Sequence, residues 1–221
     1  MPVVEFPDPR EADENGIVAF GGDLHPDTLR LAYRQGIFPW PHTGFPLLWF
    51  CPLERAVLEF DRLHIPRSLA KARRQSPLRF TLDTAFEQVI EQCRRIKRPG
   101  QRGTWITPEI QRAYIRLHRS GDAHSVEAWD ETGALVGGLY GVDSGGVFSG
   151  ESMFHLAPNA SKLALLFFVD YLSSRGADFI DIQQLTPHMA ALGAWEIERD
   201  DFLARSDTAR QRGLILFDKA G

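Results

Sequence analysis

The chain has 221 residues, of which 43% are hydrophobic and 24% charged, and its formal net charge is -4. This composition is that of a folded globular protein and excludes a disordered chain, a collagen and a coiled coil. The length suits one large domain or two modest ones. A negative average surface repels polyanions, so taken alone the charge argues against a nucleic-acid partner.

Cysteine usage and the N-terminal sequence bear on the compartment. Cys51 and Cys93 are too far apart for a Cys-x-x-Cys motif, so neither a disulfide framework nor a zinc site is expected. The N-terminus lacks a basic stretch followed by an apolar core, and the longest apolar run, Leu163 to Val169, is too short to span a bilayer. We therefore expect a cytoplasmic protein without a membrane partner.

The charges are distributed unevenly along the chain. Between Arg62 and Arg102 eleven basic residues stand against three acidic ones, a net of +8, which leaves -12 for the rest. One interpretation is a solvated helix face, because charge runs usually have that origin. The other is a patch that binds phosphates and orients a polyanion.

The first half of the chain predicts few regular elements before Leu53. Up to there the sequence is rich in Gly, Pro and aromatic residues, with one short helix from Pro26 to a stop at Gly36. A helix capped by Asp83 is expected from the helical spacing of four apolar residues. Between these two helices we expect strands at 56–60 and 78–82 and a basic helix at 66–75; the apolar positions of the capped helix are Phe86, Val89, Ile90 and Cys93.

The second half predicts a sheet with helices. A basic loop at 98–103 precedes a helix that begins near Pro108 and ends at Gly121. Three runs joined by short turns then form an antiparallel meander. Together the elements predict an α+β fold with a mostly antiparallel central sheet. The expected ranges are 124–129, 134–142 and 147–154 for the meander, 159–176 for an apolar helix, 179–183 for a strand, a short helix after Pro187, and 213–217 for a last strand.

Several common chemistries have no motif here. The chain contains no P-loop and no Gly-x-Gly-x-x-Gly after a strand, and its seven histidines lack metal-ligand spacing. Gly150-Glu-Ser152 lacks the second glycine of a nucleophile elbow, which argues against a hydrolase triad. We therefore expect neither a cofactor nor a metal.

Polar residues interrupt two of the predicted strands. Glu151 and Ser152 lie in one of them, and Asp181 and Gln183 alternate with isoleucines in the other. Residues two apart share a face of a strand, so Asp181 and Gln183 are expected to point the same way. Either backbone groups satisfy these side chains, or they mark a functional cleft, because a buried carboxylate without partners is costly.

At this point the sequence resembles the leucyl/phenylalanyl-tRNA-protein transferases. Ten stretches carry the resemblance in order across nearly the whole chain, which is far more specific than any one of them. They are Gly21-Gly-Asp-Leu24, Gly36-Ile-Phe-Pro-Trp40, Leu48-Trp-Phe-Cys-Pro52, Gly103-Thr-Trp-Ile-Thr107, Ala123-His-Ser-Val-Glu127 with Trp129, Leu135-Val-Gly-Gly-Leu-Tyr-Gly-Val142, Gly150-Glu-Ser-Met-Phe154, Ala160-Ser-Lys162, Ile180-Asp-Ile-Gln183 and Leu192-Gly-Ala194.

The resemblance implies an enzyme that moves Leu, Phe and less readily Met from aminoacyl-tRNA to proteins with N-terminal Arg or Lys, creating a bacterial N-degron. It further implies a small N-terminal domain, here 1–60, before a GNAT-like catalytic domain, here 61–221, and no metal or soluble cofactor. The residues Ile182 and His155 depart from the usual family pattern and leave the donor ranking among Leu, Phe and Met open.

The resemblance also implies roles for individual residues. Gln183 would contact the attacking amine through its side-chain carbonyl, Asp181 would polarise that amide, and Glu151 would attract the basic N-terminal residue. The aminoacyl-adenosine would lie among Trp49, Trp105, Met153, Phe154, Ile182, Leu139 and Ser152. For the tRNA we expect Arg73, Arg74, Arg95 and Arg98 in the basic segment.

Two other functions remain open from the sequence. An acyltransferase that uses acyl-CoA would need a pyrophosphate-binding loop between strand and helix, and the chain shows no such motif. A non-catalytic adaptor for basic N-termini or tRNA would bind the same partners without turnover.

Overall fold

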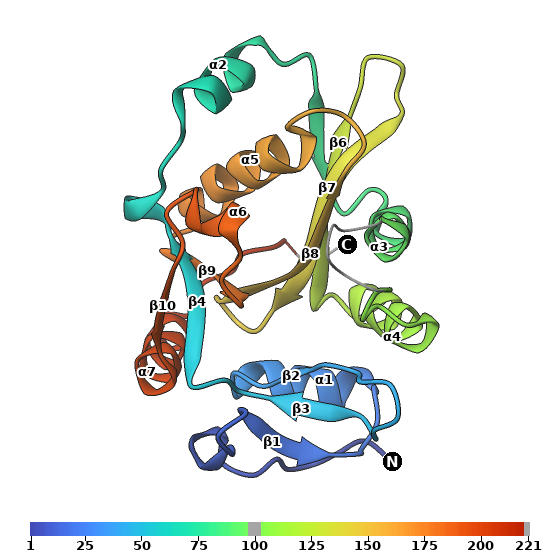
Figure 1. Ribbon diagram of the computed structural model, residues 1–221, viewed down its shortest axis with the longest axis vertical. Coiled ribbons are helices and arrows are strands. Elements are labelled where there is room, and N and C mark those ends of the chain that lie inside the picture. The colour runs from blue at the N-terminus through green and yellow to red at the C-terminus, as the bar shows by residue number, and fades with distance from the viewer. Residues whose placement is uncertain (97–102, 219–221) are drawn as a thin grey trace.

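The computed structural model describes residues 1–96 and 103–218, arranged as a small and a large sheet with seven α-helices in the described parts. In the small sheet, β3 (Leu48–Phe50) lies between β1 (Ile17–Phe20) and β2 (Phe38–Pro39). The helix α1 (Pro26–Arg34) lies beside this sheet (Figure 1). Pro26 occupies its first turn and the His25 side chain accepts a hydrogen bond from the Asp27 N–H, which confirms the expected helix start.

The large sheet has the strand order β10-β4-β9-β8-β7-β6-β5. Its strands pair in antiparallel fashion except for β8 and β9, which are parallel. Their bounds are β4 Glu54–Glu59, β5 Arg79–Leu82, β6 Ala123–Trp129, β7 Leu135–Asp143, β8 Phe148–His155, β9 Phe179–Gln183 and β10 Trp195–Glu198. The expected α+β fold with a mostly antiparallel sheet is confirmed.

Helices cover both faces of the large sheet (Figure 1). One face packs against α5 (Ala160–Ser174), and the other against α3 (Phe86–Arg95) and α4 (Pro108–Arg119). The α5 helix is apolar on almost every side because it is buried in a core of its own, with Leu163, Leu166 and Phe168 at or below 4% exposure. The remaining helices are α2 (Arg67–Gln75), α6 (Pro187–Ala190) and α7 (Arg199–Gln211).

Two expected features of the helices and strands are wrong. Asp83 does not cap α3: Ala85 occupies the cap position, and Asp83, at φ +58°, accepts hydrogen bonds from the Ser125 N–H and the His124 ring. Residues 213–217 form no strand. The edge position beside β4 belongs instead to β10, and α7 follows it.

The stretch before Leu53 is more regular than expected, because it contains the three strands of the small sheet. The strand β4, which follows it, belongs to the large sheet through β9 and β10. Because β4 pairs with strands of the large sheet, the change from the small sheet to the large one falls just before Glu54. The division into domains at residue 60 stays a prediction.

Candidate active site

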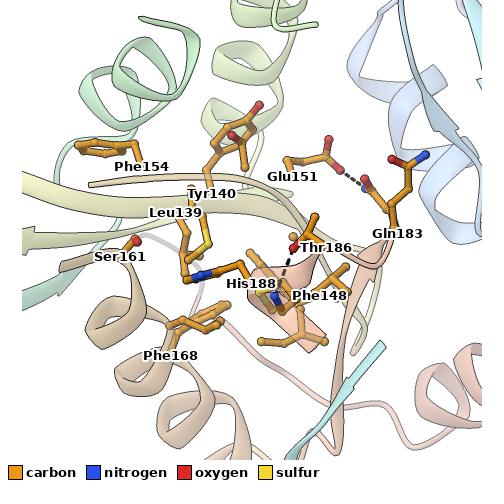
Figure 2. A pocket seen from close by; sticks show the side chains of 18 of the residues that line it. Leu139, Tyr140, Phe148, Glu151, Phe154, Ser161, Phe168, Gln183, Thr186 and His188 are labelled. Atoms are coloured by element: carbon orange, nitrogen blue, oxygen red, sulfur yellow. Dashed lines mark hydrogen bonds between the residues drawn. The ribbon is translucent and has the colours of Figure 1, made fainter. Parts of the chain in front are cut away.

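A gap between β8 and β9 creates the site. The two strands pair only at Phe148–Ile180 and Ser149–Asp181, although both continue beyond those residues. Past this point they separate, so Glu151 and Gln183 face each other across an opening in the sheet. The side chains join through a hydrogen bond of 2.5 Å from Gln183 Nε2 to Glu151 Oε1 (Figure 2).

The gap opens into a cavity of about 520 Å³. Figure 2 shows Glu151 and Gln183 together on one side, and Leu139, Phe154 and Phe168 away from them on the other. The cavity thus has a polar end and an apolar remainder, the usual form of a site that buries an apolar group and holds a reacting one.

Glu151 accepts hydrogen bonds from three neutral groups. The Tyr33 hydroxyl donates to Oε1 over 2.6 Å, the Tyr114 hydroxyl to Oε2 over 3.3 Å, and the two hydroxyls also contact each other. Burial raises the pKa of the Glu151 carboxyl to about 7, with a smaller contribution from the charge of Asp181, against the hydrogen bonds, which lower it. A carboxyl of this kind changes its protonation state near neutral pH.

Asp181 lies in a different environment, fully buried and paired with a cation. Arg55, itself 1% exposed, donates to both carboxylate oxygens over 2.7 Å. The Ser149 hydroxyl and the Gln183 backbone N–H donate to the same group over 2.7 and 3.0 Å. Four hydrogen bonds therefore occupy the carboxylate, which leaves it closed to a substrate.

The guanidinium of Arg55 is held from several sides. It lies 4.7 Å from the ring centre of Phe38 and 4.5 Å from that of Phe202, and it donates to the Gly36 carbonyl over 3.1 Å. These contacts come from β2 of the small sheet, the loop between α1 and β2, and α7. Arg55 thereby ties the small sheet to the strand that carries Gln183.

The backbone of Gln183 departs from the strand that precedes it. The residue has φ +63°, in the left-handed region that disfavours side chains, and the pairing of β9 with β4 shifts between Asp181 and Gln183. Asp181 is enclosed in the sheet and hydrogen-bonded to Ser149, whereas Gln183 lines the cavity and is hydrogen-bonded to Glu151, on the same strand as Ser149. Ile180 and Ile182 both pack in the core that contains α5. Asp181 contacts the Gln183 backbone N–H and not its amide.

Most residues expected around the donor line the cavity. Trp49 is the exception, at 1% exposure, with its ring against Phe6 and its indole N–H donating to the Gly21 carbonyl. A ring enclosed in this way has no face for stacking on a base, so the expected contact of Trp49 with adenosine needs correction. The expected residues that do line the cavity are Trp105, Leu139, Ser152, Met153, Phe154 and Ile182.

Trp40 lines the cavity, and Trp49 is not among the lining residues. The register pairs Phe38 with Phe50 and Pro39 with Trp49, and residues opposite each other share a face of the sheet. Trp40 and Phe38 line the cavity, whereas Trp49 packs against Phe6 and donates to the Gly21 carbonyl. Trp40 ends the family motif Gly36-Ile-Phe-Pro-Trp40, so the sequence already marked this residue as a candidate.

The expected tRNA-binding arginines lie in different parts of the fold. Arg73 and Arg74 are exposed on α2, where Arg73 pairs with Asp170 of α5. Arg95 ends α3 on the opposite face of the sheet and pairs with Glu91 (Figure 1). Arg98 lies outside the described residues. The described part of the basic segment is therefore distributed around the sheet and does not form one compact patch.

Sequence reasoning missed Tyr33, Tyr114 and Arg55. Each touches a predicted site residue from far away in the chain, so no local motif announces it. Among the described residues, no group of three or more metal-binding side chains is placed to hold an ion, and no helix is long and apolar enough to cross a bilayer.

The fold first defines a class, an α+β protein with a mostly antiparallel sheet that helices cover on both faces. The solved structure of FemX shares the fold with a TM-score of 0.51 at 10% identity, covering 78% of this chain and 66% of FemX. At this identity the likeness concerns the fold alone.

The sequence then gives the family. Residues 57–207 match the leucyl/phenylalanyl-tRNA protein transferase family, and residues 22–53 match the N-terminal domain of the same family. The transferase of Nitratidesulfovibrio vulgaris is 53% identical over 95% of this chain and 90% of its own length. The transferase of Anaeromyxobacter sp. strain K is 52% identical over 90% and 85%. The chain therefore belongs to the leucyl/phenylalanyl-tRNA protein transferase family and is an aminoacyltransferase.

Proposed function

We propose that the protein transfers leucine, phenylalanine and, less readily, methionine from aminoacyl-tRNA to the N-terminal Arg or Lys of acceptor proteins. The observation that supports this most is the joined pair Glu151 and Gln183 at the polar end of an otherwise apolar cavity. The acyl side chain fits the apolar part, and the ester carbonyl is then presented to the polar pair. In a bacterial cytoplasm the product would carry a destabilising N-terminal residue and enter degradation.

The donor is proposed to bind by shape and stacking. Leu139, Met153 and Ile182 line the part that receives the acyl side chain. Such walls discriminate by only about 1–3 kcal/mol per methylene, so a site of this kind accepts several similar side chains. Trp40 and Trp105 replace the expected pair Trp49 and Trp105 for the adenosine, since each base–aromatic stack is worth roughly 1–3 kcal/mol.

The acceptor is proposed to bind at Glu151, whose ionised form attracts a cationic N-terminal residue. The Gln183 amide nitrogen donates to Glu151, and its carbonyl oxygen is proposed to accept a hydrogen bond from the attacking amine. A neutral amide is too weak a base to keep a proton, so Gln183 orients the amine and guides the proton, with the terminal ribose hydroxyl of the tRNA as a relay. Asp181 is a positioning residue in this scheme, because it acts through the Gln183 backbone.

The test is a transfer assay with purified protein, leucyl-tRNA and an Arg-starting peptide without ATP. We expect a Leu-extended peptide by mass spectrometry, because aminolysis of an ester is downhill. A peptide that starts with Glu is the matched control and should remain unextended. Absence of product with the Arg peptide would contradict the assignment, and mixed charged tRNAs in the same assay rank Leu, Phe and Met.

The tRNA body is proposed to contact the basic segment, including Arg73, Arg74, Arg95 and Arg98. Reversing the charges of Arg73 and Arg74 should weaken tRNA binding and flatten its dependence on salt, since each lost phosphate contact lowers the slope by about 0.7–0.9. Reversal at Arg95 tests the other face of the sheet separately. If the salt dependence of tRNA binding equals that of the wild type, these arginines do not contact phosphates and are part of a solvated helix face.

A further inference from the structure

Glu151 is surrounded by donors that carry no charge. Tyr33 comes from α1, Tyr114 from α4 and Gln183 from β9, and among the described residues these three are its hydrogen-bond partners. The tyrosines are 2% and 0% exposed, and burial raises the pKa of both hydroxyls well above the ordinary value, so both stay protonated. The helices α1 and α4, which pack against each other, thus provide fixed, neutral hydroxyls for one carboxylate.

This arrangement suits a group that gains and loses a proton. A carboxylate kept permanently ionised is paired with a cation, as Arg55 does for Asp181. Neutral donors stabilise the anion less, and a phenol hydroxyl can also accept a hydrogen bond from the protonated acid. The environment of Glu151 therefore tolerates both states without an unpaired buried charge in either.

We propose that Glu151 is the base that takes the proton from the attacking α-ammonium group, with Tyr33 and Tyr114 as positioning residues. This rests on the proposed transfer reaction and assigns Glu151 a step beyond attracting a cationic acceptor. Gln183 supports it, because the residue that faces the amine is hydrogen-bonded directly to this carboxylate. The base thus lies next to the orienting group.

The α-ammonium gives one proton to a Glu151 oxygen, and the freed lone pair attacks the ester carbonyl carbon. The new C–N bond forms, the bond from that carbon to the ribose oxygen breaks, and the second proton of the nitrogen passes to the leaving ribose oxygen. Glu151 then releases its proton to water, so the products are the extended peptide, the free ribose hydroxyl and one proton.

Within residues 1–96 and 103–218, few charged and titratable groups lie near Glu151. Asp181 lies behind it on β9 and is paired with Arg55 of β4, and the tyrosines face it from α1 and α4. His155 and His188 line other parts of the same cavity. The shift of the carboxyl pKa to about 7 agrees with the proposed role, because a base is most effective when its pKa is near the working pH.

The first experiment compares the pH dependence of transfer, measured as single-turnover rates with one peptide, for the wild type and Tyr33→Phe. Loss of the Tyr33 hydroxyl removes a hydrogen bond that lowers the Glu151 pKa. We expect the low-pH limb of the profile to move up by about 1 unit, the equivalent of one hydrogen bond. The amine of the peptide is the same throughout, so the shift belongs to the enzyme. A Tyr33→Phe profile with lower rates but an unchanged apparent pKa on the low-pH limb would overturn the proposal.

Two further variants complete the test. Tyr171→Phe removes a hydroxyl that donates to the Leu216 carbonyl, outside the cavity lining, and should leave the profile unmoved. Tyr114→Phe repeats the test from α4 should Tyr33→Phe fail to fold.

The variant Glu151→Gln distinguishes a catalytic base from an anchor, a group that only binds the cationic N-terminal residue of the acceptor. A base predicts a fall in kcat of about 10²–10⁴-fold at saturating peptide. An anchor predicts a raised KM with kcat kept, and that result would overturn the proposal. Failure of the transfer reaction as such is distinct, because the wild type itself would then give no product at any pH.

Discussion

Two carboxylates on neighbouring strands of one sheet have opposite surroundings. Asp181 on β9 is fully buried and bound by an arginine, a serine and a backbone N–H. Glu151 on β8 lines the cavity and is bound by two phenols and an amide. The residue types are nearly the same, so the partners determine what each acid does.

The difference between the partners of Asp181 and Glu151 indicates different roles for the two carboxylates. The Asp181–Arg55 pair joins β9, β4 and the small sheet, and its charge is cancelled where it stands. The Glu151 cluster contains no cation among the described residues, and its carboxyl pKa of about 7 leaves its charge adjustable. Asp181 holds the backbone at Gln183, and Glu151 lines the cavity.

The largest effect is expected from Arg55→Met. The variant leaves the Asp181 carboxylate buried without its cation, which costs about 3–5 kcal/mol of unfolding free energy in comparable cases. Urea unfolding at pH 7 measures it. The double variant with Asp181→Asn is the control and should recover a large part of the loss, because no buried charge remains. A single variant within 1 kcal/mol of the wild type would show that the pair is not needed for stability.

The sequence predicted Glu151 and Gln183 of the candidate site but not the residues that hold them. Glu151 and Gln183 could be found because polar residues interrupt apolar strands, and motifs mark the same positions. Arg55 could not be found, because it meets Asp181 from 126 residues away and nothing local distinguishes it from a surface arginine. Tyr33 of α1 and Tyr114 of α4 could not be found either, because their spacing with other buried residues of the same helix predicts only a place in the hydrophobic core.

Contacts within the fold explain another miss. Trp40 and Trp49 both stand in quoted motifs, and only the structure shows that Trp40 lines the cavity whereas Trp49 packs against Phe6. The helix α7 carries charged residues on nearly every side, so apolar periodicity did not reveal it. The order of the predicted strands and helices gave the α+β class, whereas contacts across the sheet determine which side chain enters the cavity.

The next effect concerns Glu151 and stability. Its pKa rises from 4.5 to about 7 on folding, so between these pH values the unfolded chain ionises before the folded one. The unfolding free energy therefore falls as the pH rises through this window, by roughly 3 kcal/mol for the whole shift. Glu151→Gln cannot ionise, and we expect it to be more stable than the wild type at pH 8 and similar at pH 4.5.

Thermal or urea unfolding at the two pH values measures this difference. Glu91→Gln is the matched control, because Arg94 and the other partners of Glu91 lower its carboxyl pKa to about 2. That substitution should not stabilise the protein at pH 8. Equal effects of Glu151→Gln at both pH values would remove the contrast between the two acids.

The smallest effect tests whether Asp181 acts on the backbone of Gln183. At φ +63° a side chain is disfavoured and glycine is not, so Gln183→Gly should be more stable than Gln183→Ala by about 1 kcal/mol. Both variants lack the side-chain amide, so both should lose transfer activity. A difference in stability between them then reports the backbone conformation alone. An alanine variant as stable as the glycine variant would mean that the Asp181 hydrogen bond to the Gln183 N–H does not hold this residue in the left-handed region.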